Sequence, residues 1–121
     1  MSKTILTVDD SRMMREMLLM VLKEAGFNVV QAEDGREGLD ALTRANPDVI
    51  ITDINMPNLD GYGFIEGVRQ DQRYRATPII VLSTENSPEK KNRAREAGAT
   101  GWIVKPFQAE TLVDVIRRLS A

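Results

Sequence analysis

The chain has 121 residues, of which 16 are Lys or Arg and 18 are Asp or Glu, and its formal net charge is -2. It contains no cysteine and no histidine, which excludes disulfides, zinc–thiolate sites, imidazole bases and a Ser-His-Asp triad. The charge balance argues against a nucleic-acid-binding domain, and no apolar run approaches the roughly 18–20 residues of a membrane span. We therefore expect a single cytoplasmic domain over residues 1–121, with no nucleic-acid partner and no insertion into a membrane.

Short apolar runs predict the strands. Several of these runs are β-branched and nearly continuous, which is typical of parallel strands that are buried on both faces. In chain order they lie at Ile5–Val8, Val29–Val30, Val49–Ile51, Ile79–Leu82 and Trp102–Val104.

Amphipathic stretches between and after these runs predict the helices. The first ends at Gly26, a residue type that often follows a helix C-terminus, and residues 35–45 and 61–70 carry weaker helical patterns. Ser87 and Pro88 predict the start of a helix that ends near Gly98, because Ser favours the N-cap and Pro the first helical position. The core faces of the first and last helices are expected to consist of Met14, Met17, Leu18, Val21, Leu22 and Ala25, and of Leu112, Val115, Ile116 and Leu119.

Three further apolar residues of the first helix, Met13, Leu19 and Met20, lie off its main apolar face. They are either scattered surface residues or a small docking patch for a kinase.

The five βα units predict an α/β fold, because a parallel crossover is right-handed and places its helix against the sheet. Five units are too few for the eight-stranded barrel. We therefore expect an open, doubly wound, five-stranded parallel sheet covered by five helices. Sheets of this kind bind ligands outside the carboxyl ends of their strands.

Charged and hydroxyl residues follow four of the five predicted strands. Taken singly, Asp10 or Ser11 is an ordinary helix cap, and the others are ordinary turn, loop or solvated residues. Together they would converge on one edge of one sheet, which favours a functional site. In chain order they are Asp9 and Asp10, Asp53, Ser83 and Thr84, and Lys105.

Electrostatics indicates what such a site would hold. Two like charges about 4 Å apart repel by roughly 4 kcal/mol at an effective dielectric constant of about 20, so three adjacent carboxylates need compensation. One divalent cation together with Lys105 would balance them, and oxygen ligands suit Mg²⁺ or Mn²⁺. A hard cation, a lysine and a hydroxyl around a carboxylate form a phosphoryl-transfer site, in which the carboxylate can itself be the nucleophile.

Four segments carry a family resemblance: VDDS at 8–11, ITDINMPNLDG at 51–61, PIIVLSTE at 78–85 and GWIVKPF at 101–107. They resemble the receiver domains of two-component response regulators, above all the single-domain chemotaxis regulators, over essentially the whole chain. The resemblance implies a flavodoxin-like strand order, 2-1-3-4-5.

The resemblance also assigns the phosphoryl-transfer residues. Asp53 matches the phosphoacceptor, and Lys105 matches the lysine that contacts the phosphoryl oxygens. Asp9 and Asp10 match the acidic pair that holds Mg²⁺, with Asp10 as the more direct ligand and Asp9 acting partly through water. Together with Asp53, the backbone carbonyl of Asn55 would complete the metal site.

Further positions match the switch that family members use. Ser83 corresponds to the switch hydroxyl, and Trp102 corresponds to the switch aromatic, which is more often Tyr or Phe. Asn55 and Glu85 match two positions that tune hydrolysis of the phosphoaspartate. Thr84 stands where a small residue favours access to the acceptor.

The predicted helix from Ser87 to Ala97 departs from the chemotaxis pattern because it is highly charged. Lys91 and Arg95 fall on the surface that contacts targets in the family, next to Trp102. This face is either an ordinary solvated helix face or a site for an acidic partner segment. The departure puts the flagellar motor switch in doubt as the target, although it leaves the phosphorylation chemistry intact.

We interpret the sequence as a phosphorylation-activated signalling switch rather than a conventional enzyme. Its expected partners are a histidine kinase, a downstream protein target and a phosphatase, and we expect a monomer without an output domain. The same chemistry would serve a phosphate sink or a phosphorelay shuttle. A flavin-binding module is disfavoured because Asp9 and Asp10 would repel a phosphate. An aspartate-dependent phosphohydrolase is disfavoured because Asn55 stands where such enzymes need a second acid.

Overall fold

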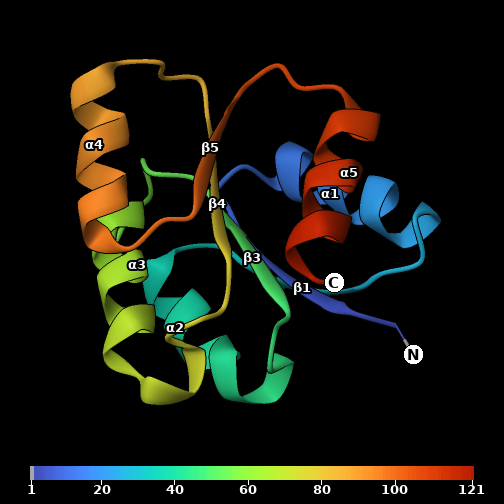
Figure 1. The fold of residues 1–121 in the computed structure, drawn as a ribbon, viewed down its shortest axis with the longest axis horizontal. Coiled ribbons are helices and arrows are strands. Elements are labelled where there is room, and N and C mark those ends of the chain that lie inside the picture. The colour runs from blue at the N-terminus through green and yellow to red at the C-terminus, as the bar shows by residue number, and fades with distance from the viewer. Residues whose placement is uncertain (1) are drawn as a thin grey trace.

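The computed structural model describes residues 2–121. Within them, five parallel strands form one sheet in the order β2-β1-β3-β4-β5, which confirms the expected doubly wound order (Figure 1). No helix in this part of the chain is long and apolar enough to cross a membrane. The strands are β1 (Thr4–Val8), β2 (Asn28–Ala32), β3 (Val49–Thr52), β4 (Ile79–Ser83) and β5 (Gly101–Val104).

Helices cover both faces of the sheet. In Figure 1, α1 and α5 lie on one side, and α2, α3 and α4 lie on the other. A short 3-10 helix, η1 (Gln72–Tyr74), follows α3. The helices are α1 (Arg12–Glu24), α2 (Gly35–Ala45), α3 (Gly61–Gln70), α4 (Pro88–Ala97) and α5 (Ala109–Leu119), close to the predicted positions.

The core has two halves because successive side chains of a strand point to opposite faces. Leu6 and Ile50 pack beneath α2, α3 and α4 with residues such as Phe64. Ile5 and Ile51 pack on the other face, beneath α1 and α5. The central strands are therefore mostly apolar, with Thr7 and Thr52 as buried exceptions, which explains the nearly continuous apolar runs.

The edge strands β2 and β5 differ from the central strands. All four residues of β5 are half-buried, whereas β4 is fully buried. Each edge strand has a neighbour on one side within the sheet. Burial on both faces, which the sequence predicts for several of the strands, is therefore found in the central strands and not in β2 or β5.

Local capping fixes the helix starts. The Ser11 hydroxyl accepts a hydrogen bond from the Met14 backbone N–H, so Ser11 rather than Asp10 caps α1. The Ser87 hydroxyl caps α4 in the same way, with Pro88 at the first helical position. Because Ser11 is the cap, the Asp10 carboxylate remains available at the sheet edge.

One core prediction for α1 is wrong. Met17 was expected on the buried face, but its residue is 40% exposed. Leu18 and Leu22 are the fully buried residues of this helix. Met17 instead lies with Met13 and Met20, which are 81% and 61% exposed, on a separate stripe with helical spacing.

A single arginine organises the loops at the amino ends of β4 and β5. Arg69, near the end of α3, donates from Nε and Nη2 to the Gly98 carbonyl at 3.0 and 2.8 Å. Its Nη1 donates to the carbonyls of Tyr74 and Thr77 at 2.8 and 2.7 Å, and to that of Arg75 at 3.2 Å. Burial lowers the pKa of Arg69 from its ordinary value.

Candidate functional site

Strand pairing brings two of the predicted carboxylates together. Val8 and Thr52 are register partners in β1 and β3, so Asp9 and Asp53 leave the sheet at neighbouring points. Carboxylate oxygens of Asp9, Asp10 and Asp53 lie within 4.8 Å of one another. The sheet edge thus gathers the three acids that the sequence analysis placed there.

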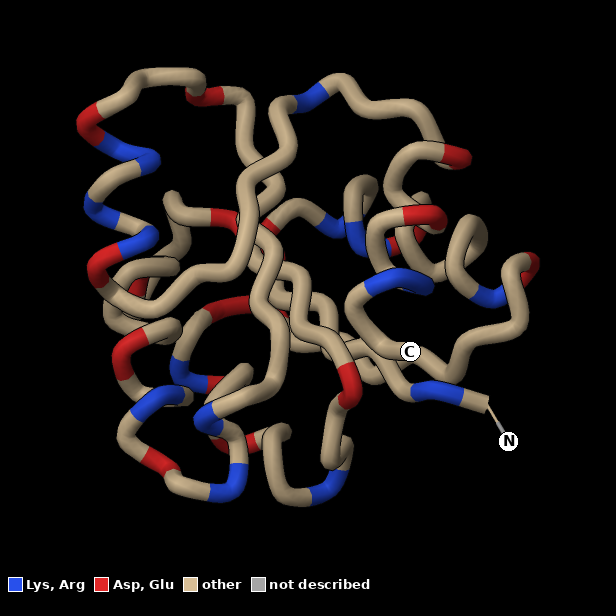
Figure 2. Tube along the Cα trace, viewed as in Figure 1, with Lys and Arg blue, Asp and Glu red and all other residues tan. Residues whose placement is uncertain are grey.

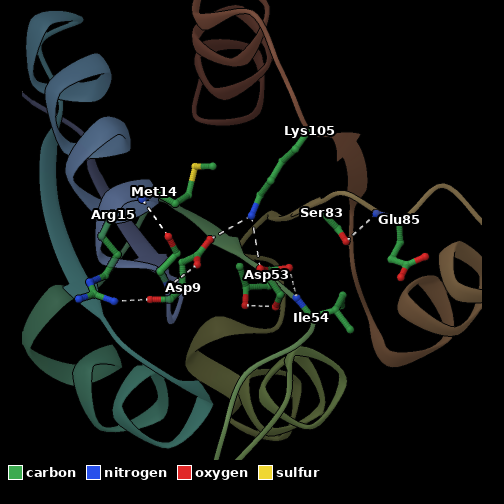
Figure 3. Close-up of polar contacts among 10 residues, drawn as sticks. Asp9, Met14, Arg15, Asp53, Ile54, Ser83, Glu85 and Lys105 are labelled. Carbon is green, nitrogen blue, oxygen red and sulfur yellow. Dashed lines mark hydrogen bonds and ion pairs between the residues drawn. The ribbon is translucent and has the colours of Figure 1, made fainter.

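Lys105 reaches these acids from the end of β5 (Figure 3). Its Nζ lies 3.3 Å from Asp9 Oδ2 and 3.3 Å from Asp53 Oδ2. Its side chain is 12% exposed, and its backbone N–H donates to the Ser83 carbonyl at 2.8 Å. One ammonium therefore bridges two carboxylates in a site shielded from bulk water, where charge interactions are less screened.

Asp9 is the most buried of the three acids. Burial raises the pKa of its carboxyl above the ordinary value of 3.8, although the Ser11 backbone N–H and Lys105 act in the opposite direction. The Arg15 guanidinium donates from Nη1 to the Asp9 carbonyl at 2.7 Å, which fixes the backbone at this point. Ionised Asp9 is thus held where desolvation disfavours its charge.

Asp53 presents one oxygen to Lys105 and keeps the other for the backbone. Its Oδ1 accepts a hydrogen bond from the Ile54 N–H at 2.7 Å. The loop then returns to α3 at Gly61, whose N–H donates to the Ile54 carbonyl at 2.8 Å. A Cβ at Gly61 would collide with the Asp53 carbonyl, so glycine is needed for this close approach.

The donor set fits a hard divalent cation. Three carboxylates and one ammonium leave a formal charge of -2 when the acids are ionised. Carboxylate, carbonyl and water oxygens are the ligands that Mg²⁺ and Mn²⁺ prefer. Asn55, whose backbone carbonyl is the fourth predicted ligand, is exposed in the loop after Asp53.

Ser83, Glu85 and Trp102 form one hydrogen-bonded series. The buried Ser83 Oγ accepts from the Glu85 N–H at 3.1 Å. The Trp102 indole Nε1 donates to the Glu85 carbonyl at 2.9 Å, and the Glu85 carboxylate pairs with Lys90 Nζ at 3.0 Å. Glu85 therefore connects the Ser83 hydroxyl both to Trp102 and to the first turn of α4.

The family model of the response regulator receiver domain matches residues 5–117. The chain belongs to this family. It is 35% identical over 116 residues to the chemotaxis protein CheY of Pseudomonas aeruginosa, which covers 95% of this chain and 94% of the relative. Identity to the chemotaxis protein CheY-3 of Vibrio cholerae is also 35%, covering 95% of this chain and 89% of that protein.

Solved structures agree with this assignment. The chemotaxis response regulator CheY4 of Vibrio cholerae is similar to this receiver with a TM-score of 0.94 and 46% identity, covering 98% and 99% of the two chains. The receiver domain of the sensor histidine kinase PA1611 from Pseudomonas aeruginosa has a TM-score of 0.91 and 26% identity, covering 99% and 98%. That structure has a magnesium ion coordinated in its active site cleft.

The predicted partner residues of this receiver also lie together. Lys91, Arg95 and Trp102 line one cavity of about 90 Å³ between α4 and β5. Figure 2 shows that Lys and Arg residues recur along the trace of α4. Arg93 on the same helix has a different environment, because its guanidinium lies 4.0 Å from the centroid of the Tyr62 ring on α3.

Sequence reasoning missed several residues around the receiver site. Arg15 binds the Asp9 carbonyl and Lys90 holds Glu85, but both occur in helices where a basic residue is ordinarily solvated. Met14, Met17 and Phe107 line a cavity that also includes Lys105. The sequence analysis assigned no role to Phe107 and predicted no cavity at this place.

Proposed function

We propose that this receiver is a phosphorylation-dependent switch in which Asp53 accepts a phosphoryl group from a partner histidine kinase. The single observation that carries the proposal is the contact of one Lys105 ammonium with both Asp9 and Asp53, 3.3 Å from each. The arrangement places a nucleophilic carboxylate beside fixed positive charge, as phosphoryl transfer requires.

The proposed transfer uses the side chains in distinct roles. Asp53 attacks phosphorus with a carboxylate oxygen, while the Lys105 ammonium stabilises the negative charge on the phosphoryl oxygens. Mg²⁺ held by Asp9, Asp10 and Asp53, with the Asn55 carbonyl, would supply further positive charge there. Ser11 and Arg15 keep the Asp9 segment in place through their hydrogen bonds to it.

The proposed output passes along the hydrogen-bonded series from Ser83. A phosphoryl oxygen on Asp53 would attract the Ser83 hydroxyl, which contacts the Glu85 N–H in the structure. Glu85 would then shift Trp102 through its carbonyl. This is a population shift driven by a local charge, and Asn55 and Glu85 at the edge of the site would tune how long the phosphoryl group lasts.

We further propose that the surface of Lys91, Arg95 and Trp102 binds an acidic segment of a downstream protein, because two cations flank its cavity. The names of the Pseudomonas and Vibrio relatives favour a role in chemotaxis. The flagellar motor switch is a candidate target, and a phosphate sink without a target is the alternative.

The test is phosphorylation with acetyl phosphate and Mg²⁺, followed by mass spectrometry of the intact protein. Wild type should gain the mass of one phosphoryl group in an acid-labile form, and Asp53→Asn should gain none. Asp40→Asn, which alters an exposed carboxylate on α2, should behave as wild type. A phosphorylated Asp53→Asn protein would place the acceptor elsewhere and overturn the proposal.

A further inference from the structure

One cation–π contact joins helices α3 and α4, which lie side by side against the sheet (Figure 1). The Arg93 guanidinium on α4 lies 4.0 Å from the centroid of the Tyr62 ring on α3. Tyr62 is 5% exposed, so the guanidinium covers a ring that is otherwise buried. Neither the proposed phosphoryl transfer nor the proposed target surface uses this contact.

Arg93 has carboxylates within reach on its own helix, yet its guanidinium contacts the ring. Glu89 and Glu96 stand four residues before it and three residues after it, positions from which a carboxylate can pair with an arginine. Among residues 2–121, Arg93 forms no ion pair. We therefore attribute the position of the guanidinium to the Tyr62 ring.

Two cavities meet at this contact. One, of about 340 Å³, is also lined by Glu85 and Lys90. The other, of about 310 Å³, is also lined by Glu66, one turn farther along α3. Tyr62 and Arg93 line both cavities, so lifting the guanidinium from the ring would join two spaces that the contact separates.

The Tyr62 hydroxyl is buried beneath this contact. Its oxygen is sealed from solvent and has no hydrogen-bond partner within the part of the chain that the structure describes. A buried, unpaired hydroxyl costs free energy, which offsets part of the stabilisation from the cation–π contact. Movement of α4 away from α3 would let water reach the phenol. We therefore expect the closed and open positions of α4 to be close in free energy, as a switch requires.

We propose that the Arg93–Tyr62 contact is a latch that holds α4 in place before phosphorylation and opens when the receiver switches. This inference rests on the proposed function, because the phosphoryl group on Asp53 supplies the free energy that opens the latch. Loss of the latch should therefore favour the switched conformation even without phosphorylation.

Glu85 connects the acceptor site to the latch. Its N–H donates to Ser83 Oγ, and its carboxylate pairs with Lys90 Nζ at 3.0 Å in the first turn of α4. Lys90 and Arg93 are three residues apart and share one face of the helix. A shift of Glu85 toward the acceptor site would therefore pull the helix face that carries Arg93.

The test measures the affinity of the receiver for beryllofluoride in the presence of Mg²⁺ by isothermal titration calorimetry. Beryllofluoride is a reversible mimic of a phosphoryl group on a carboxylate. A ligand that needs the switched conformation binds more tightly when that conformation is more populated. Arg93→Met should therefore lower the dissociation constant by about fivefold, the factor that a partly exposed cation–π contact is worth. Loss of a positive charge by itself would instead weaken the binding of an anion.

Matched variants separate the latch from general effects of charge and packing. Arg93→Lys keeps a cation over the ring and should stay within about twofold of wild type. Arg44→Met removes an exposed charge from α2 and should not tighten binding. In a Tyr62→Leu background, which lacks the ring, Arg93→Met should have no further effect. Tyr62→Phe keeps the ring and should not bind more tightly than wild type.

Each alternative outcome is distinct. If Arg93→Met binds beryllofluoride as wild type does or more weakly, the latch is wrong and the proposed function stands. If Arg93→Met tightens binding by the same factor in the Tyr62→Leu background, the effect does not pass through the ring, and the inference is also overturned. If wild type binds no beryllofluoride and gains no phosphoryl group from acetyl phosphate, the proposed function itself fails, and the latch fails with it.

Discussion

Two cations act at opposite ends of the same sheet, and they do so in opposite ways. Arg69 lies near the amino ends of β4 and β5, where it donates to neutral carbonyl oxygens. Lys105 lies at the carboxyl ends, where it contacts two carboxylates that belong to a mutually repelling cluster. The first arrangement satisfies every group involved, whereas the second leaves excess negative charge. We therefore expect the contacts of Arg69 to stabilise the fold and those of Lys105 to serve the proposed phosphoryl transfer.

The largest expected effect comes from Arg69→Met. The variant keeps an apolar chain of similar length but removes the guanidinium donor from the carbonyls of Gly98 and Thr77, and leaves the Tyr74 carbonyl with the Thr77 N–H alone. Loss of hydrogen bonds from a partly buried charged group should lower the free energy of unfolding by about 3–4 kcal/mol. Urea unfolding at neutral pH measures this change.

The control for that prediction is Arg73→Met. Arg73 pairs with Asp71 at 2.8 Å on the surface, where its side chain is 63% exposed. Its removal should cost less than about 1 kcal/mol. If the two variants lose equal amounts of free energy of unfolding, the Arg69 contacts contribute little to stability. The proposed difference between the two ends of the sheet would then be wrong.

At the other end of the sheet, removing a charge should raise the free energy of unfolding instead of lowering it. Asp10→Asn relieves repulsion within the acidic cluster while preserving size, so the metal-free variant should be more stable than metal-free wild type by about 1–2 kcal/mol. Millimolar Mg²⁺ should raise the urea midpoint of wild type and raise that of the variant much less.

The alternative, in which Asp10 is an ordinary solvated carboxylate beside the Ser11 cap, makes the contrary prediction. Under it, Asp10→Asn would be neutral or destabilising in chelator, and Mg²⁺ would move neither midpoint. Asp40→Asn serves as the matched charge control, since it removes one exposed carboxylate from α2. Its midpoint should respond to Mg²⁺ as that of wild type does.

Ser83→Ala tests the connection between the reactive end and the target surface. Loss of the buried hydroxyl leaves the Glu85 N–H without its acceptor and should cost about 1 kcal/mol. Trp102 is the single tryptophan of the chain, so its emission and iodide quenching report one position. Both should change on phosphorylation of wild type and change less in Ser83→Ala. An identical response in the two proteins would exclude Ser83 as the link.

The smallest effect concerns acid stability outside the cluster. Hydrogen bonds from the Glu37 backbone N–H and the Asn58 amide hold the pKa of Asp34 below its ordinary value of 3.8. The stability that Asp34 contributes is therefore present above that value and is lost as the pH falls through the folded-state pKa. Asp34→Asn should have a lower free energy of unfolding than wild type at about pH 6, and this difference should be smaller at about pH 3. A difference that grows as the pH falls would show that the lowered pKa of Asp34 is not its cause.

Much of the site could be predicted from the sequence because parallel strands place their carboxyl ends along one edge. Asp9, Asp53 and Lys105 each follow a strand directly, so their approach depends on topology more than on side-chain packing. The strand order itself came from the family resemblance. Continuous apolar runs were reliable for the central strands, where both faces are covered.

Interactions that depend on long side chains could not be predicted. Arg69, Arg15 and Lys90 occupy helical positions at which basic residues are ordinarily solvated. Arg69 and Arg15 bind backbone carbonyls, and Lys90 pairs with a carboxylate in the loop before its helix. Periodicity also misplaced Met17, because the stripe with helical spacing is wider than the surface that α1 buries. Arg15, Lys90 and Met17 lie near the site, whereas Arg69 lies at the opposite end of the sheet.

The attachment of α4 has a mechanical consequence. Its buried residue is a small one, Ala94, and its C-terminal end is fixed through the bonds of Arg69 to Gly98. Its first turn is held by the half-exposed pair of Lys90 and Glu85. Apart from the Arg93 guanidinium on the Tyr62 ring, little apolar area holds this helix, at about 25 cal/mol per Å², so we expect a tilt about its fixed C-terminal end to cost little free energy. One or two new hydrogen bonds at the sheet edge, each worth about 1 kcal/mol, would then be enough to favour the tilted position.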